Sequence, residues 1–501
     1  MVLRPSLCTR AALGLFHPKP RTMPLRAKIL SSGFSPQKMS ASSLVIKEQE
    51  GDAPNDVIFR STYGVRTIEL NRPEVLNALD GSMARKMVPR LREWEKSQMA
   101  NIIILKGVGR TLCAGGDVVA LARLIKEEGP AGVQKAVEYF ELEYRLDHLI
   151  ATYPKPYVAF MDGITMGGGV GLSVHAPFRI ATENTLLAMP ETKIGFFPDV
   201  GGSFFLPRLD GEIGTYLALT GKGLKGVQAF YSGLATHYIH STSLPDLEAR
   251  LAELVFGDYQ PLEERWEIVD STIEEFVTGL PENTPIELSG ETRKAIDRCF
   301  KFNTIEKILE ALTREDSDWA GETLETIKSH SPTSVRVTLR QLRAGKEWAI
   351  SETFQRELHM AAKFVERKDF LEGVHALLIL KTSGPEWDPP TLESSDESVT
   401  DPYFTVRDGD RPRLQLLRDE SDAGFTDYKQ YPHAKIGLPS EAEVRQLIRE
   451  RKMLPDDIIP YLIEDRNGKI GLVEKVRDIL DRKVGTGVDR AVWKEEVAGQ
   501  D

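Results

Sequence analysis

Two glycine-rich turns each follow an apolar stretch that favours a buried strand. Residues 101–106 (NIIILK) precede Cys113-Ala114-Gly115-Gly116-Asp117, and residues 157–161 (YVAFM) precede Gly163–Gly171, which contains a triple glycine. A glycine that opens a helix costs about 1 kcal/mol relative to alanine, so three of them indicate a backbone that must lie against something. Either turn alone is also typical of a tight strand-to-helix connection. Together they could aim two N–H groups at one carbonyl oxygen.

Two carboxylates follow these turns. Glu191 stands among apolar residues (Met189, Ile194, Phe196 and Phe197), and Asp199 lies in the turn-rich segment after them. A carboxylate in an apolar pocket has a raised pKa and can act as a base near neutral pH. Each acid alone could equally cap a helix or lie in solvent. Glycine turns that supply donors, followed by a base, favour chemistry at a carbonyl group.

The cysteines predict neither a metal centre nor a disulfide framework. There are only three (Cys8, Cys113 and Cys299), and no CxxC pair is present, which favours reduced thiols. Cys113 adjoins the first glycine turn, but no histidine has a spacing that supports a nucleophilic role. We therefore expect Cys113 to be a packing residue.

A longer series of motifs resembles the crotonase (enoyl-CoA hydratase/isomerase) superfamily, and within it the 3-hydroxyisobutyryl-CoA hydrolases. The resemblance covers roughly residues 50–400 in order. The motifs are NRPEVLNALD, LCAGGD, GITMGGGVGLSVH, AMPETKIGFFPDVGG, LPRL, LALTG, SPTSVRVTLRQL and DFLEGVHALLILK. So long an ordered match is more specific than any single motif.

The resemblance implies a role for particular residues. The oxyanion donors correspond to the backbone N–H groups of Gly116 and Gly168, and the acid/base glutamate corresponds to Glu191. The additional acid of the hydrolases corresponds to Asp199, and a substrate-contacting glutamate corresponds to Glu143. The implied reaction is hydrolysis of 3-hydroxyisobutyryl-CoA, as in valine catabolism. Glu191 acts either as a general base on water or as a nucleophile that forms a mixed anhydride.

The resemblance also places the coenzyme A chain of the substrate along Leu76, Ala78, Ala114 and Gly116. Coenzyme A is part of the substrate and leaves as a thiolate, so we expect no separate cofactor and no metal. Two positions depart from the hydrolase pattern, since His375 stands where that pattern usually has arginine and Leu380 where it has aspartate.

Another reaction of the same superfamily, that of an enoyl-CoA hydratase or isomerase, is an alternative to hydrolysis. Hydratases of the superfamily use two glutamates, one of them just after the triple glycine. That position is Gly171 in this chain, which has no side chain. Hydrolysis is therefore favoured over hydration.

The elements that must position these residues follow from periodicity. Residues 57–70 alternate around Gly64 and predict a hairpin. Strands separated by helical stretches indicate an α/β fold with parallel pairing, and the resemblance implies a spiral of ββα units. Beyond residue 240 we expect helices over 244–256, 261–278, 292–314 and 334–343. Residues 383–402, rich in Pro, Ser and acid, predict a linker or an extended wrap.

Four regions result. Residues 1–43 are basic, free of acid and rich in Ser, which is typical of a mitochondrial transit peptide and indicates the matrix. Residues 50–240 form the crotonase-like core, and 241–400 its helical continuation. Residues 401–501 are expected to form a separate, mainly helical extension in which Ser440 caps a helix.

The charge balance narrows the choice of partners. The net charge is −11 although residues 1–43 are basic, so the body is acidic and no direct DNA binding is expected. No apolar run reaches 18 residues, which argues against a membrane span. Fungal relatives of the hydrolases resemble a component of the small subunit of the mitochondrial ribosome. The extension would suit such a partner, so a structural role is the main alternative to catalysis, and the two could coexist.

Overall fold

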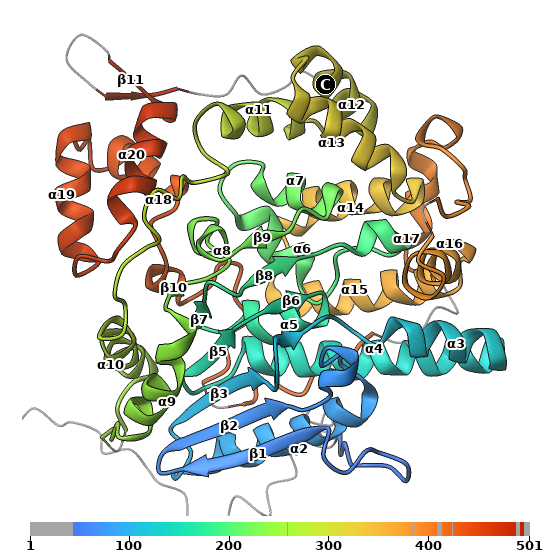
Figure 1. Ribbon diagram of the computed structural model, residues 1–501, viewed down its shortest axis with the longest axis horizontal. Helices are drawn as coiled ribbons and strands as arrows, with labels where there is room; N and C mark the ends of the chain where they lie inside the picture. The colour runs from blue at the N-terminus through green and yellow to red at the C-terminus, as the bar shows by residue number, and fades with distance from the viewer. Residues whose placement is uncertain are drawn as a thin grey trace, which may run out of the picture.

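A mixed six-stranded sheet begins with the predicted hairpin. The computed structural model describes residues 44–257, 259–382, 384–407, 413–422, 424–486 and 491–494 (Figure 1). β1 pairs antiparallel with β2 around Tyr63 and Gly64, and every other pairing in this sheet is parallel. The strands, in sheet order, are β1 (Val57–Thr62), β2 (Val65–Leu70), β3 (Ile102–Gly107), β5 (Tyr157–Met161), β7 (Phe178–Ala181) and β10 (His237–Tyr238).

A second, four-stranded sheet takes its strands alternately with the first. The strands, in sheet order, are β4 (Thr111–Cys113), β6 (Ile164–Met166), β8 (Leu186–Ala188) and β9 (Leu224–Lys225). β3, β5 and β7 of the first sheet are each followed along the chain by β4, β6 and β8 of the second. The helices between them are α2 (Gly81–Lys96), α3 (Val118–Glu128), α4 (Pro130–Ala151) and α5 (Gly168–Val174). This repetition confirms the predicted spiral of strand–strand–helix units.

The central strands are buried on both faces because their alternating side chains enter two cores. Ile103 and Leu105 of β3 belong to the larger core, whereas Ile102 and Ile104 pack with β7 and α9 (Leu244–Ala252) in a smaller one. The sequences of such strands are continuous apolar runs, as is usual for parallel strands that are covered on both faces.

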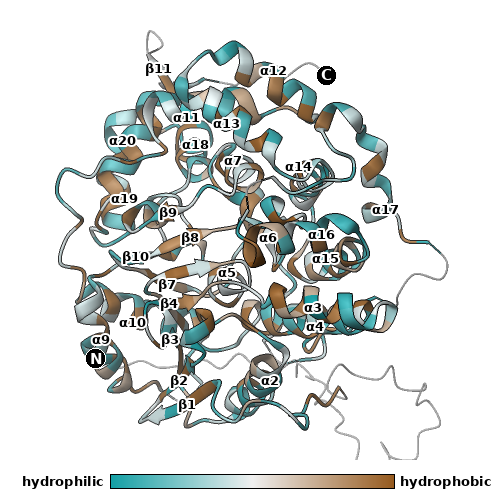
Figure 2. Ribbon diagram, turned by 45° about the vertical axis from the view of Figure 1, so that its right-hand side comes forward, coloured by the Kyte–Doolittle hydropathy of each residue, from teal (hydrophilic) through white to brown (hydrophobic). Residues whose placement is uncertain are grey.

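Helices form the rest of the framework. They are α6 (Gly202–Phe205), α7 (Ile213–Thr220), α8 (Val227–Tyr231), α9 (Leu244–Ala252), α10 (Leu262–Glu274), α11 (Gly290–Phe300), α12 (Ile305–Glu315), α13 (Asp318–Ser329), α14 (Pro332–Gly345), α15 (Ile350–Val365), α16 (Lys368–Gly373), α17 (Asp401–Phe404), α18 (Glu441–Arg449), α19 (Pro455–Asp465) and α20 (Leu472–Lys483). On α12 the buried residues recur with helical spacing, at Ile305, Ile308 and Leu312, and Figure 2 shows the outer helices striped in this way. No helix in these described ranges is long and apolar enough to cross a bilayer.

Three helical predictions need correction. The single helix expected over 292–314 is two helices, because Thr304 adopts an extended N-cap conformation and lets α12 fold back on α11. The helices expected over 244–256 and 261–278 are shorter and end at Ala252 and Glu274.

Of the two forms expected for residues 383–402, the structure has the extended wrap, in which the segment after residue 383 packs around α14. Arg336 of α14 is buried, and its guanidinium donates to the Ser395 hydroxyl and to the Glu397 carboxylate, each at 3.0 Å. It also donates to the carbonyl of Leu392 at 2.9 Å. A buried guanidinium needs such acceptors, so the wrap and α14 stabilise each other.

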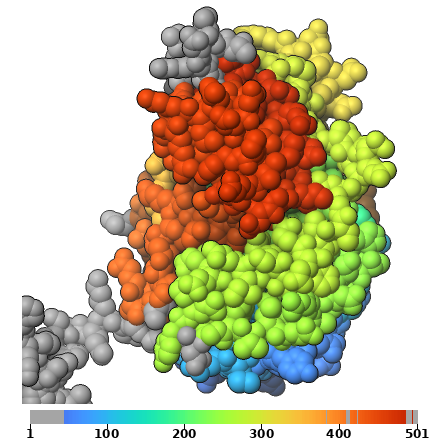
Figure 3. All heavy atoms as spheres, turned by 90° about the vertical axis from the view of Figure 1, so that its left-hand side faces the viewer, coloured from blue at the N-terminus to red at the C-terminus, as the bar shows by residue number. Residues whose placement is uncertain are grey.

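The residues after 401 were expected to form a separate piece, but they pack against the core. The Tyr428 hydroxyl donates to the Ala151 carbonyl at 2.9 Å, and Arg145 donates to the Gln415 carbonyl at the same distance. Further on, α20 packs against α11, and Glu441 of α18 pairs with Arg293 of α11 at 2.9 Å. Figure 3 shows this red part of the chain lying directly against the green one. The extension is thus an integral part of the fold.

Candidate active site

The two glycine turns lie side by side because the strands that lead into them are neighbours. β4 and β6 pair in parallel, with Thr111 opposite Ile164 and Cys113 opposite Thr165. Parallel strands end at the same edge of a sheet, so the turns that follow them meet there. Gly115 and Gly167 have φ angles of +111° and +45°, which side-chain-bearing residues rarely adopt.

The amides of Gly116 and Gly168 are close together. A methyl group added at Gly168 would lie 3.3 Å from the Gly116 nitrogen. Gly168 is the first residue of α5, where backbone N–H groups have no partner within the helix. Leu79 pairs with the Gly115 carbonyl and the Asp117 amide, each at 2.8 Å, which leaves the Gly116 amide outside this ladder. The arrangement suits an oxyanion hole.

Close backbone contact explains the triple glycine. A methyl group at Gly169 would lie 2.3 Å from the carbonyl oxygen of Cys113, so any side chain there would push the two turns apart. The Cys113 thiol itself is buried, and burial raises its pKa to about 12. A thiol with so high a pKa is not a thiolate near neutral pH, in agreement with the predicted packing role.

Glu191 points toward these turns and not into solvent. It begins a short 3-10 helix (Glu191–Ile194) after β8 and is 6% exposed. Its Oε1 would lie 3.0 Å from a methyl group at Gly167. Burial, and then the neighbouring charges of Asp199 and Glu143, raise the pKa of Glu191 well above its usual range.

Asp199 and Glu143 complete the predicted set. The Tyr144 hydroxyl donates to Asp199 Oδ2 at 2.7 Å. Burial raises the pKa of Asp199 to about 7, while this hydrogen bond lowers it. Glu143 Oε1 would lie 2.5 Å from a methyl group at Gly168, so its carboxylate adjoins the second amide. Burial and the charge of Asp199 raise the pKa of Glu143 well above its usual range.

Two further buried carboxylates were not foreseen. Asp147 is one helical turn after Glu143 on α4, so both point the same way, and its Oδ2 would lie 2.9 Å from a methyl group at Gly171. Glu357 of α15 accepts from the amides of Gly201 and Ser203 at 2.7 and 2.9 Å. Burial raises the pKa of Glu357 to about 8. Five carboxylates so close together cannot all be ionised at once near neutral pH.

The segment expected to contact coenzyme A borders the first glycine turn. The Ala114 amide donates to the Leu76 carbonyl at 3.0 Å, and Asn77 holds the segment through its amide group, which donates to the Thr111 carbonyl at 2.8 Å. Leu76, Ala78 and Ala114 therefore lie together beside Gly116. Their contact with coenzyme A stays a prediction.

Comparison with known proteins places the chain in a family. A family profile described as enoyl-CoA hydratase/isomerase matches residues 65–404. The chain belongs to the enoyl-CoA hydratase/isomerase (crotonase) family.

Members of this crotonase family with different names resemble the chain over different lengths. Small ribosomal subunit protein mS47 of Neurospora crassa is 51% identical and covers 99% of this chain and 100% of its own length. The mitochondrial 3-hydroxyisobutyryl-CoA hydrolase of Danio rerio is 43% identical and covers 71% of this chain and 91% of its own. The crystal structure of a carnitinyl-CoA dehydratase from Mycobacterium thermoresistibile superposes with a TM-score of 0.63 at 34% identity, over 74% of this chain and all of that one.

Tyr431, which lies beyond the crotonase profile, supports the loop that carries Asp199 by way of His175. His175 is buried, and burial lowers its pKa to about 4, so its ring is neutral near pH 7. The Val200 carbonyl can only accept, hence His175 Nε2 donates to it at 2.9 Å. His175 Nδ1 must then accept from the Tyr431 hydroxyl at 2.8 Å. Tyr431 thus holds His175, which holds the residue after Asp199.

A Tyr431→Phe variant should lose stability and, if the site hydrolyses a thioester as expected from the resemblance, should also release thiol more slowly. It leaves Nδ1 of His175 buried without a partner, which costs about 1–3 kcal/mol, and it loosens the Asp199 loop. A catalytic group misplaced by about 1 Å can cost up to about 100-fold in rate. The checks are the free energy of unfolding and the rate of thiol release.

Tyr428→Phe is the matched control for this variant. The Tyr428 hydroxyl is buried and donates to the Ala151 carbonyl, away from the Asp199 loop. It should lose stability and keep the rate of thiol release. Equal rates for the two variants would contradict the positioning role of Tyr431.

Activity and stability should respond to pH in opposite directions. In the role expected for it, Asp199 acts as a carboxylate, so kcat/KM should rise with pH as this group ionises around pH 7. The unfolded chain ionises Asp199 near its ordinary pKa of about 3.9. Between about pH 4 and 7 the folded state therefore binds more protons, and its stability falls as the pH rises. Asp199→Asn should flatten part of this slope, and a pH-independent rate from pH 5 to 8 would count against the assignment.

One group of metal-ligand-type side chains lies away from the site. His237 Nε2 lies 2.9 Å from Asp270 and 3.2 Å from Glu274. The Lys469 ammonium lies 3.0 Å from the same nitrogen and pairs with Glu274. The lysine of the extension thus takes the position in which a cation would lie.

Proposed function

We propose that the chain is a component of the small subunit of the mitochondrial ribosome and retains an acyl-CoA thioester hydrolase site. The first half rests on the similarity to small ribosomal subunit protein mS47, which extends over 99% of this chain. That similarity includes the residues after 404, where the crotonase profile ends. The basic, acid-free residues 1–43 suit import into mitochondria, and they lie outside the described residues.

Sedimentation of the full chain tests the ribosomal role. Deleting residues 401–501 is a poor test, because Arg418 and Tyr428 are buried in the core and their loss would damage the fold. The full-length, tagged chain should instead co-sediment with mitochondrial small subunits and stay with them when the two subunits are separated at low magnesium. A chain found only in the soluble fractions would exclude the role.

The second half of the proposal rests on one observation. The amides of Gly116 and Gly168, from separate loops, adjoin each other within reach of the buried Glu191. Two N–H donors stabilise the oxyanion that forms when a thioester carbonyl is attacked, and each such donor is typically worth about 2.7–4 kcal/mol. A cavity of about 530 Å³ is lined partly by Asp117, which follows Gly116, and by Tyr139, whose hydroxyl would lie 2.9 Å from a methyl group at Gly116.

The residues suggest a sequence of steps for 3-hydroxyisobutyryl-CoA. The carbonyl oxygen accepts from the two amides. In one route Glu191 removes a proton from water, the water oxygen attacks the carbonyl carbon, and the carbon–sulfur bond then breaks. In the other route the Glu191 carboxylate attacks that carbon, the carbon–sulfur bond breaks to leave an anhydride, and water then opens the anhydride. In both routes coenzyme A leaves as a thiolate. Asp199 and Glu143 would hold the hydroxyl group of the acyl chain.

Steric crowding argues against hydration. A methyl group at Gly171 would lie 2.6 Å from Val200 Cβ and 2.9 Å from an Asp147 oxygen. The position used for a second glutamate in hydratases therefore has no room for a side chain. Hydration would show as loss of the double bond of an enoyl-CoA without release of thiol, and that result would replace the hydrolase proposal.

A further inference from the structure

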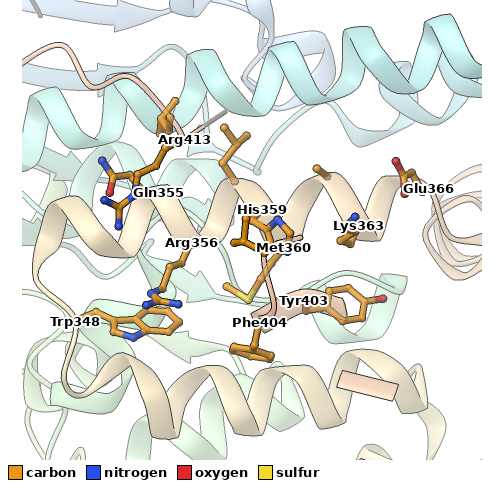
Figure 4. Close-up of a pocket in the computed structure, with 14 residues that line it drawn as sticks. Trp348, Gln355, Arg356, His359, Met360, Lys363, Glu366, Tyr403, Phe404 and Arg413 are labelled. Atoms are coloured by element: carbon orange, nitrogen blue, oxygen red, sulfur yellow. The ribbon is translucent and has the colours of Figure 1, made fainter. Parts of the chain in front are cut away.

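A groove on the outer face of α15 has no role in the proposed reaction. It lies between this helix and residues 403–406 and 413–414, and it encloses about 470 Å³ (Figure 4). Pockets for small ligands commonly have this size. Glu357, which belongs to the carboxylate cluster, is on the buried face of the same helix, so the groove and the active site are separate.

The groove is rich in cations. Arg356, Lys363 and Arg413 line it, and Glu366 is the one acidic residue among its described lining residues. Figure 4 shows Arg413 and Arg356 toward one end and Lys363 toward the other. Cations on both sides of a narrow groove suit a ligand that carries more than one negative charge.

Its floor is aromatic and is stacked with guanidinium groups. Arg356 lies over the Trp348 ring with its carbon 5.0 Å from the centroid. It pairs with Glu352 at 2.8 Å, and its side chain is 41% exposed. Phe404 also lines the groove, and Arg340, which is not a lining residue, lies over this ring at 4.6 Å. Guanidinium planes and aromatic rings are the surfaces on which unpaired bases stack. A simple anion, or an acidic peptide, would need the charges but not these flat surfaces.

One polar group of the groove lacks a partner. The Tyr403 side chain lines the groove and is 3% exposed, and its hydroxyl has no hydrogen-bond partner among the described residues. A buried hydroxyl left unpaired costs about 1–3 kcal/mol. A ligand with hydrogen-bonding groups would supply the missing partner.

We propose that this groove binds a ribonucleotide whose phosphate meets Arg356, Lys363 and Arg413 and whose base stacks on the flat surfaces. The N-terminal residues 1–43 of the chain are a poor occupant, because they carry seven basic and no acidic side chains. Val406 and Arg413 lie beyond the crotonase profile, which ends at residue 404, so one wall of the groove comes from the extension.

Fluorescence anisotropy with a labelled, unstructured ten-nucleotide RNA tests the proposal on the full chain. The double variant Arg356→Ala/Arg413→Ala should bind at least about 10-fold more weakly, and the slope of log K against log salt should fall by about 0.7 for each phosphate that the variant no longer neutralises. Arg90→Ala is the matched control. Arg90 also stacks on a ring, at 5.2 Å from the Phe59 centroid, and pairs with a glutamate, but it lies outside the groove.

Competition distinguishes the sources of the nucleotide. If AMP displaces the RNA, the groove is a site for a free nucleotide. If AMP does not displace it, the ligand of the groove is an RNA strand. Both results agree with the proposal. Unchanged binding by the double variant would overturn it, as would equal displacement by an oligoglutamate peptide. This assay needs neither ribosomes nor thioester hydrolysis, so its outcome is independent of both proposed functions.

Discussion

A Glu191→Gln variant should release thiol from 3-hydroxyisobutyryl-CoA at least about 100-fold more slowly than the unaltered chain, as is usual when an acid/base group is lost. Glutamine keeps the size of the side chain but neither accepts the proton of water nor attacks the carbonyl. Asp199→Asn should slow the reaction by a similar factor. The charge of Asp199 helps to raise the pKa of Glu191, and the Tyr144 hydroxyl holds the Asp199 carboxylate in the site.

The fold should tolerate both changes. Buried carboxylates with raised pKa values repel one another when ionised, so replacing one by a neutral amide should not lower the free energy of unfolding at pH 8. Glu93→Gln, at a site on α2 that is 63% exposed, is the control and should keep the full rate. Near-normal rates for both site variants would reject the assigned roles.

An Arg293→Met variant should lower the free energy of unfolding by about 3–5 kcal/mol, the usual cost of leaving a buried charge without its partner. Arg293 is 2% exposed and pairs with Asp297 and with Glu441 of the extension, both at 2.9 Å. These acids belong to a buried network of four acidic and four basic side chains, namely Asp210, Asp297, Glu441, Asp478, Arg293, Lys475, Arg482 and Lys483. Removing one cation leaves an unbalanced negative charge at the point where α18 and α20 join the core.

The neighbouring Lys294 provides the control for this network. Its side chain is 43% exposed and pairs with the exposed Glu291, and exposed pairs contribute about 0–1 kcal/mol. Lys294→Met should therefore leave stability nearly unchanged in urea unfolding. If Arg293→Met were equally harmless, the extension would not depend on this network for its attachment.

The sequence was sufficient to predict the parts of the site that obey local rules. Apolar runs followed by glycines predicted the two strand ends, and costly glycines predicted their close approach, which the contacts of Gly168 and Gly169 explain. The hairpin and the parallel α/β pairing were also predicted from periodicity, whereas the spiral of strand–strand–helix units came from the family resemblance. The burial of Glu191 followed from its apolar neighbours.

The parts that depend on distant contacts could not be predicted in this way. Asp147 had one signal, its helical spacing from Glu143, but only the fold reveals that it adjoins Gly171. Tyr431 lies 256 residues from His175 in the chain, and no local pattern connects them. The extension was expected to be a separate piece, whereas its buried ion pairs attach it to the core.

The net charge likewise gave no indication of the groove beside α15. An overall charge of −11 argues against broad contact with a polyanion, yet Arg356, Lys363 and Arg413 gather locally around a single cavity. One chain could thus present a nucleotide-binding groove on one side and an acyl-CoA site on the other. Tyr431 connects the extension to the second of these sites.

The most direct test of the central claim is release of thiol by the purified chain from 3-hydroxyisobutyryl-CoA, followed with a thiol-reactive dye. Free coenzyme A should accumulate with the unaltered protein and at no more than about one hundredth of that rate with Glu191→Gln. If the unaltered protein liberates no thiol, or if both proteins liberate it equally fast, then the paired amides of residues 116 and 168 do not serve thioester hydrolysis.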